Sequence, residues 1–496
     1  MRLIDIIVFL AYLIGITIYG SSFFKKNRTS DSYSLGSSNI PAWVISMSIF
    51  ATFVSSISFL ALPGNAYLSN WNAFVFSLSI PISLAVAVKY FVPLYRKINS
   101  PSAYTFLETR FGPWARIYVS SCYLLTQIMR VGTILYLLAL TLNAVVGWDI
   151  VTVIVLTGLT VTVYSLLGGF EAVVWTDAIQ GIILIGGALA TLVYIFFAMP
   201  EGPGQVFSIA AENNKFDLGS FGPSLSEPTF WVVLVYGIFI NLQNYGIDQN
   251  YVQRYMASKT DKEAKKSAFW GGMIYVPVSL IFIFIGTALY SFYHSGAATL
   301  PEDLSGKSDR IFPYFIVNQL PAGLTGLLIA SVFAAGMSTI STGFNSSATV
   351  FLTDYYKRFS TKPVSEKKAL RILYLSSLII SILGMGVAVA MINVKSALDA
   401  WWQLASIFSG GMLGIFLLAA FSRVAKSANA LAGTIAGILV ILWMSLSPLI
   451  WGDDTAAIRF HSFLTIVFAT VTIFFFGFFS AVFLKRNKSK MRLTEV

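Results

Sequence analysis

The sequence predicts an all-α protein that crosses a membrane many times. Of its 496 residues, 56% are hydrophobic and only 11% are charged, whereas about a quarter of the residues of a soluble chain are charged. Apolar stretches of helical length recur almost from end to end, and each is long enough to cross a hydrocarbon core of ~30 Å. The chain therefore lacks the polar surface of a soluble protein and has helices suited to lipid.

Thirteen candidate spans follow when the apolar windows are divided at Pro and Gly. They cover residues 4–24, 41–67, 72–95, 116–146, 150–168, 171–199, 228–250, 268–294, 320–352, 368–391, 398–421, 427–449 and 461–484. No A-x-A-like cleavage site follows the first of them, and Lys25, Lys26 and Arg28 do. We therefore expect it to be a retained span rather than a signal peptide.

The basic residues predict the orientation. With the N-terminus outside, 25 of the 33 Lys and Arg residues fall in cytoplasmic segments and 6 in outer segments. Cytoplasmic loops carry such an excess, so the N-terminus is predicted outside the cell membrane and the C-terminus in the cytoplasm. The net charge of +11 lies in these loops, which argues against a nucleic-acid partner. Residues 485–496 are predicted to be a basic anchor at the anionic leaflet.

Two predicted spans are interrupted by polar residues. The span 41–67 carries hydroxyl and β-branched residues from Ser48 to Ser58, which make a weak helix centre. Five spans later, residues 241–250 contain Asn, Gln, Gly and Asp. Unwound backbone at membrane depth is tolerated where it lines a cavity, and interruptions at matching positions of two halves are typical of inverted-repeat transporters. The alternatives are ordinary packing through small residues and, for 241–250, the cytoplasmic end of a span.

These features predict five parts of the chain. In order, they are a leading span with a cytoplasmic loop (1–40), a first five-helix repeat (41–199), an outer loop (200–227), a second five-helix repeat (228–421), and two trailing spans with a basic cytoplasmic tail (422–496).

Hydroxyl groups gather in the span 320–352. Ser338, Thr339, Ser341 and Thr342 include pairs three and four residues apart, which lie on one side of a helix. Hard oxygens of this kind suit a small cation that gives up its water, although Ser and Thr also pack helices or bond to their own backbone. Asp177 lies ~9 Å into its span, where a carboxylate needs a partner or a bound cation. Both features fall in the cytoplasmic half of their spans, so they could meet.

Arg130 lies near the middle of its span, at a depth where a guanidinium is costly. Its fork suits a carboxylate or clustered hydroxyls, and the structural alternative is a pair with a protein acid. A single cysteine, Cys122, excludes an intramolecular disulfide, and His294 and His461 are far apart in the sequence. The sequence shows neither a set of converging catalytic groups nor a channel filter. We therefore expect the protein to be neither an enzyme nor a channel.

Four stretches resemble the sodium/solute symporter family, which is built on the leucine-transporter fold. They are Phe50–Phe59, Leu167–Gly181, Val252–Tyr255 and Phe333–Thr342. The resemblance covers residues 4–484 and implies one leading span, an inverted pair of five helices and two trailing spans. It implies a secondary symporter that imports a small polar solute with sodium by alternating access.

The resemblance also implies two sodium sites. The positions that match the family's shared site are Ala51, Val54, Ala335, Ser338 and Thr339. Members that resemble bacterial sialic acid transporters have a second site, and its matching positions are Asp177, Ser338, Ser341 and Thr342. Sodium ions are thus the expected cofactors, at one site or at both.

The solute is first expected to be sialic acid (N-acetylneuraminate), because Arg130 matches the arginine that meets the substrate carboxylate in those transporters. The predicted substrate-binding residues are Ser55, Ser58, Ser77, Arg130 and Gln243. Phe53, Ala73 and Ser77 depart from the sialic acid pattern. In the galactose-transporting branch, an amide is expected at position 58 and an acid at position 77, whereas this chain has serine at both positions. Another sugar or a monocarboxylate therefore stays as an alternative.

A membrane sensor that does not transport is the alternative from another class. Such a protein often carries an added soluble domain, whereas only residues 485–496 follow the last predicted span. We expect the protein to work as a monomer, with the solute and the lipid bilayer as its partners.

Overall fold

The computed structural model describes residues 2–23, 29–36, 39–98, 100–304, 306–451 and 460–494, and these contain helices and no strand. Within them, eleven helices are long and apolar enough to cross a membrane, and one bent helix pair makes a twelfth span. The shorter apolar helix Ile150–Val163 lies where the remaining predicted span was placed. The predicted basic loop at Lys25, Lys26 and Arg28 lies outside the described residues.

The spans are built from the following helices, in chain order. They are α1 (Leu3–Ser21), α3 (Ala42–Phe53) with η2 (Ile57–Ala61) and α4 (Leu62–Leu68), α5 (Phe74–Leu78) to α7 (Val92–Ile98), α9 (Pro113–Val146), α10 (Ile150–Ala198, two spans), α12 (Phe230–Ile247), α14 (Asp261–Met273) with α15 (Tyr275–His294), α17 (Leu324–Val350), α19 (Glu366–Ala390), α20 (Ala397–Phe421), α21 (Ser427–Trp451) and α22 (Thr465–Thr494).

The first predicted interruption is a true break between α3 and α4. Helix α3 ends at Phe53, and Val54 has extended backbone angles of φ −75° and ψ 126°. The Ser55 hydroxyl then accepts the N–H of Ile57 at 3.2 Å, so a side chain satisfies a backbone donor that the new helix leaves free. The chain direction bends by 61° between the helices Ala42–Phe53 and Ile57–Leu68. Polar residues that compete with helical hydrogen bonds thus produce the predicted break.

The second predicted interruption, across 241–250, is narrower in the structure than in the sequence pattern. Helix α12 continues to Ile247, and only Asp248 leaves the helix, with φ −74° and ψ 129°. Its carboxylate accepts the N–H of Asn250 at 2.8 Å and so caps α13 (Gln249–Met256). The membrane-spanning helix therefore ends at Ile247, and the alternative that the polar run marks the end of its span is supported from Asp248 onward.

A third irregularity separates two consecutive spans inside α10. Gly169 has φ 61° and ψ 179°, a conformation that glycine adopts without the steric cost of a Cβ. The sequence boundary at Gly168 and Gly169 is confirmed by this kink.

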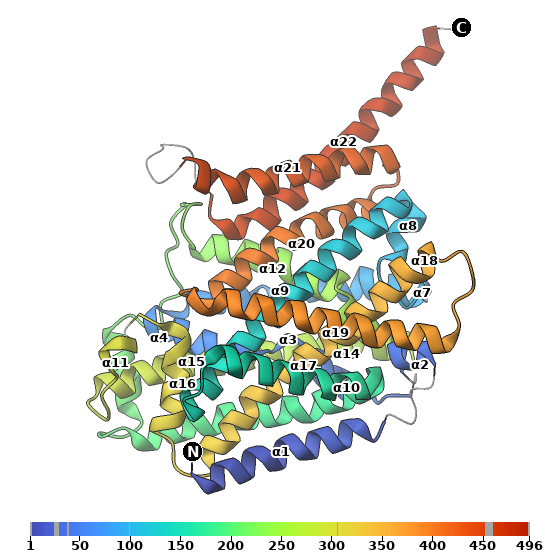
Figure 1. Ribbon diagram of the computed structural model, residues 1–496. Helices are drawn as coiled ribbons and strands as arrows, with labels where there is room; N and C mark the ends of the chain where they lie inside the picture. The colour runs from blue at the N-terminus through green and yellow to red at the C-terminus, as the bar shows by residue number, and fades with distance from the viewer. Residues whose placement is uncertain are drawn as a thin grey trace.

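Helix α17 runs through the interior of the bundle and is buried along nearly its whole length. It packs against α3, α9 and α10. The leading helix α1 and the trailing pair α21 and α22 lie on opposite sides of this core (Figure 1). The two breaks and the hydroxyl-rich part of α17 are therefore enclosed by protein rather than exposed to lipid.

Candidate ion and solute sites

Five oxygen atoms converge where the broken helix meets α17. The Ser338 hydroxyl lies 3.0 Å from the Ala51 carbonyl oxygen, and the Thr339 hydroxyl lies 3.1 Å from that of Val54. Both hydroxyls also lie within 3.2 Å of the Ala335 carbonyl oxygen. We call these five oxygens the oxygen cage. All its residues are at most 2% exposed, and all five positions predicted for the first sodium site are brought together.

The oxygen cage forms because α3 ends inside the protein. The last carbonyls of any helix have no partner within that helix and must find one elsewhere. Here the carbonyls of Ala51 and Val54 meet hydroxyls of α17, and the Thr52 carbonyl accepts a hydrogen bond from Arg130 at 2.9 Å. The donor set is neutral and made only of hard oxygens, which suits a small cation such as sodium.

The residues predicted for the second site meet only in part. Asp177 Oδ2 lies 3.5 Å from the Thr342 hydroxyl. Ser341 donates instead to the Ser338 carbonyl at 3.1 Å, and the Ser338 hydroxyl is part of the oxygen cage. The other carboxylate oxygen, Asp177 Oδ1, is buried and has no hydrogen-bond partner in the described part of the chain. That oxygen is free to take a cation.

Arg254 is a buried residue of this second site that the sequence interpretation missed. Its guanidinium lies 2.7 Å from Asp177 Oδ2 and donates to the hydroxyls of Thr342 and Ser48, each at 2.8 Å. Ser48 in turn donates to Asp177 at 2.7 Å. Arg254 follows the predicted span 228–250 and was counted among the cytoplasmic loop charges, which is wrong, because it lies on the helix α13 and is 1% exposed. A basic residue that directly follows a polar interruption was the available signal.

All five residues predicted to bind substrate line one central cavity beside the break. These are Ser55, Ser58, Ser77, Arg130 and Gln243. Among them, the Ser58 hydroxyl lies 3.2 Å from the hydroxyl of Tyr275, and the Arg130 guanidinium lies 5.9 Å from the centre of the Trp401 ring. Because the cavity has one arginine and several hydroxyls, it suits a solute with a carboxylate and hydrogen-bonding groups.

The cavity also contains polar residues that the sequence interpretation did not assign. Asp248, at the second break, lines it and interacts electrostatically with Arg130. Gln127, one turn before Arg130 on α9, lines it as well, and both polar atoms of its buried amide have no partner among the described residues. Gln127 belongs to no recognisable motif, whereas Asp248 lies in the polar run 241–250 that the sequence singled out.

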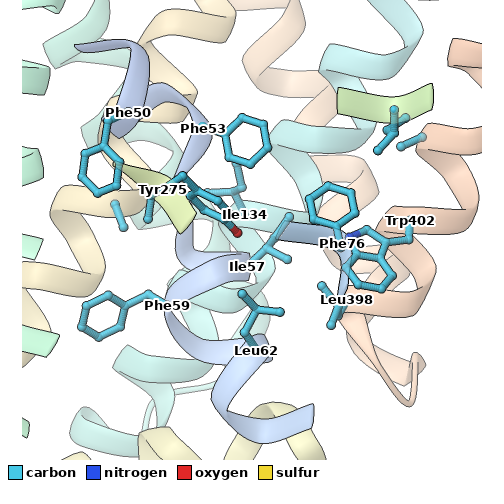
Figure 2. Packing of buried hydrophobic residues seen from close by; sticks show 14 of the residues in the cluster. Phe50, Phe53, Ile57, Phe59, Leu62, Phe76, Ile134, Tyr275, Leu398 and Trp402 are labelled. Carbon is cyan, nitrogen blue, oxygen red and sulfur yellow. The ribbon is translucent and has the colours of Figure 1, made fainter. Parts of the chain in front are cut away.

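Aromatic rings shape the rest of the cavity. Phe53, at the end of α3, stacks on Tyr245 with ring centres 5.1 Å apart and meets the edge of Tyr275 at 4.5 Å. Figure 2 shows Phe53 and Tyr275 beside the break, with Phe76 and Trp402 on the neighbouring helices. The residue that departs from the sialic acid pattern at position 53 is thus part of the cavity wall and adds an apolar surface there.

A many-span helical bundle with a broken helix, an oxygen cage at the break and a polar cavity beside it defines the class as a secondary membrane transporter. Comparison with protein families gives a match to the sodium:solute symporter family over residues 33–437. The chain belongs to this family.

Similar proteins cover nearly the whole chain. The sodium/sialic acid symporter NanT of Aliivibrio fischeri is 31% identical over 99% of this chain and 96% of its own. The sodium/sialic acid symporter SiaT of Proteus mirabilis is 33% identical over 88% of this chain and 89% of its own. A solved Na+-coupled sialic acid symporter, described as substrate-bound and outward-open with a novel Na+ site, superposes with a TM-score of 0.88 at 30% identity. This superposition covers 97% of this chain and 98% of that one.

The fold is therefore the predicted leucine-transporter type, and the protein is a multi-pass membrane symporter rather than an enzyme.

Proposed function

We propose that this protein imports sialic acid together with sodium by alternating access. The observation that carries the proposal is a buried arginine in the central cavity that directly contacts the helix break forming the oxygen cage. One residue thus lines the cavity expected to hold an acidic solute and bonds the turn whose neighbouring carbonyls are expected to hold a cation. The relatives described as sodium/sialic acid symporters support the choice of solute.

Sodium in the oxygen cage would join the break of α3 to α17. Its ligands would be Ala51, Val54, Ala335, Ser338 and Thr339. This link favours the outward-open state, which then binds the solute. Sodium release to the cytoplasm removes the link and lets the solute follow.

The solute carboxylate binds Arg130, and its hydroxyls bind the polar side chains around the cavity, which are Ser55, Ser58, Ser77 and Gln243. Phe53 and Ala73 also line the cavity and depart from the sialic acid pattern. Another sugar or a monocarboxylate is therefore the second candidate. The apolar ring of Phe53 favours a less hydroxylated part of the ligand at that wall.

The first experiment is uptake into proteoliposomes with and without an inward sodium gradient, at constant ionic strength. We expect sialic acid uptake that depends on sodium, and loss of binding in Arg130→Ala. Competition by unlabelled galactose, pyruvate and sialic acid separates the candidates, because only the true solute should compete strongly. Uptake that ignores sodium, or no uptake of any of these solutes, would count against the proposal and favour a non-transporting sensor.

A second sodium ion is proposed at Asp177, Ser338, Ser341 and Thr342. The unpartnered Asp177 Oδ1 and the novel Na+ site described for the structural relative support it. We expect the sodium Hill coefficient of uptake to approach two in the natural protein and one in Asp177→Ala. A wild-type coefficient near one would argue that a single ion is coupled.

The remaining proposals concern arrangement. We assign the inverted halves to residues 41–199 and 228–421, with the N-terminus outside the plasma membrane and the C-terminus in the cytoplasm. We propose that the protein transports as a monomer in the lipid bilayer. Accessibility of single cysteines placed at each end, in a Cys122→Ser background, tests the orientation. Transport by vesicles that contain one copy each tests the monomer.

A further inference from the structure

Arg130 is bonded to the backbone turn that forms the oxygen cage. Its guanidinium donates to the Thr52 carbonyl at 2.9 Å, and Thr52 lies between Ala51 and Val54, whose carbonyls belong to the cage. The same Thr52 carbonyl is 3.5 Å from the hydroxyl of Thr339, another cage residue. A fixed positive charge therefore lies beside a site expected to hold a second positive charge.

The oxygen cage has no charge of its own to offset this repulsion. Its five oxygens are three carbonyls and two hydroxyls, and Arg130 itself is only 7% exposed. Two like charges interact more strongly in such a buried setting than in water. A positive charge at Arg130 that is not neutralised is therefore expected to weaken sodium binding in the cage.

The two buried arginines beside the candidate sodium sites differ in this respect. Arg254 has a carboxylate partner, Asp177, at 2.7 Å. Within the described residues, no carboxylate lies within 4.0 Å of a nitrogen of Arg130. Asp248 lines the same cavity and interacts electrostatically with Arg130, but one oxygen of Asp248 is engaged in capping α13. Arg130 thus still has room for a carboxylate from the solute.

We propose that Arg130 couples the two ligands electrostatically: its charge weakens the binding of sodium in the oxygen cage, and the carboxylate of the solute removes this penalty by neutralising that charge. This inference rests on the proposed function. Because binding free energies are linked reciprocally, sodium strengthens solute binding by the same factor by which the solute strengthens sodium binding. Couplings of this kind are typically about 5- to 150-fold.

The first test is sodium titration of the purified protein without solute, with choline keeping the ionic strength constant. In Arg130→Gln we expect the sodium Kd to fall about tenfold, toward the value that wild type shows with sialic acid present. Arg130→Lys, which keeps the charge, should stay close to wild type. An Arg130→Gln variant that binds sodium equally or more weakly would overturn the inference, because an arginine that only holds Thr52 or the solute would give that result.

Arg110→Gln is the matched control. Arg110 also donates to carbonyls at the end of a helix, those of Ala419 and Ser422, but on α20 rather than at the cage. Its substitution should leave the solute-free sodium Kd unchanged. A tenfold fall in this variant as well would show a general effect of lost positive charge and would contradict the specific role of Arg130.

The second test uses only the natural protein. Sialic acid should lower the sodium Kd several-fold, whereas its methyl ester, at concentrations that saturate the cavity, should not. An ester as effective as the acid would overturn the inference. If wild type binds neither sodium nor sialic acid, the proposed function fails; if it binds both and the ester couples fully, only the coupling role of Arg130 fails.

Discussion

The two candidate sodium sites share Ser338 but differ in the charged groups that they contain. The oxygen cage is neutral and is held by hydroxyl–carbonyl hydrogen bonds of 3.0–3.2 Å. The second site contains a carboxylate, Asp177, already paired with Arg254 at 2.7 Å. One site therefore contains only neutral oxygens, whereas the other already contains a cationic side chain paired with its carboxylate.

Because of this difference, we expect the two sites to respond to sodium in different ways. In the oxygen cage, an ion meets neutral oxygens that are hydrogen-bonded to one another, so its binding displaces no charged group. At the second site, an ion must compete with the guanidinium of Arg254, which also bonds Ser48 and Thr342. Sodium there is conditional on movement of Arg254 and α13, or on use of the free oxygen Asp177 Oδ1.

The largest effect is expected from Arg254→Met. Removing one partner of a buried ion pair typically costs about 3–5 kcal/mol, because the other charge is left uncompensated. The thermal midpoint in sodium-free buffer should therefore fall by several degrees. Sodium should restore much of this loss, since the ion can then pair with Asp177, whereas choline should not.

The double variant Asp177→Asn, Arg254→Met is the control for that prediction. Replacing both partners of a buried pair is often neutral, so the double variant should be more stable than Arg254→Met and should lose the extra rescue by sodium. If Arg254→Met is as stable as wild type without sodium, the pair does not balance the site and the comparison above fails.

Thr339→Val should have the next largest effect, and only on the oxygen cage. Valine has nearly the shape of threonine but lacks the hydroxyl that bridges Val54 and Ala335. A hydrogen bond or ligand contact to a charged group is worth about 1.5–3 kcal/mol, so the sodium affinity should fall ~10- to 100-fold. Sodium dependence of uptake measures this fall. An unchanged half-saturating concentration would remove Thr339 from the site.

The features of the oxygen cage could be predicted from the sequence, whereas the ion pair of the second site could not. The helix break and the hydroxyl face were visible because local polarity interrupts an apolar span, and both are properties of short stretches. The kink at Gly169 was likewise visible as a pair of glycines. Long-range pairs were not: Asp177 and Arg254 are 77 residues apart, and the polar run before Arg254 does not reveal which acid it pairs with.

The residues of the solute cavity could likewise be predicted only in part from the sequence. Arg130 could be predicted because a charge at mid-span is costly and therefore conspicuous. Gln127 could not be assigned to the cavity, since its role depends on where α9 places it, and the polar run 241–250 did not reveal that Asp248 would interact with Arg130. The break predicted across 241–250 was too wide because a polar run does not reveal which one of its residues leaves the helix.

A smaller effect is expected from Thr342→Val, at the second site alone. Its hydroxyl lies 2.8 Å from Arg254 and 3.5 Å from Asp177, so valine removes one polar neighbour from each member of the pair. A loss of about 1 kcal/mol corresponds to roughly fivefold weaker binding of the second ion. The Hill coefficient of uptake should fall toward one while the affinity of the first ion stays the same. A loss as large as that of Thr339→Val would mean that the two sites are not independent.

The smallest effect is expected from Ser341→Ala. The Ser341 hydroxyl donates to the Ser338 carbonyl of its own helix at 3.1 Å, a local bond worth about 0.5 kcal/mol or a little more, so the second ion should weaken only about twofold. Sodium titration in the Ser341→Ala and Thr342→Val variants compares neighbouring hydroxyls of α17 directly. Equal losses would show that Ser341 turns from its helix to the ion, and the second site would then need a rearranged side chain on α17 as well as the displacement of Arg254.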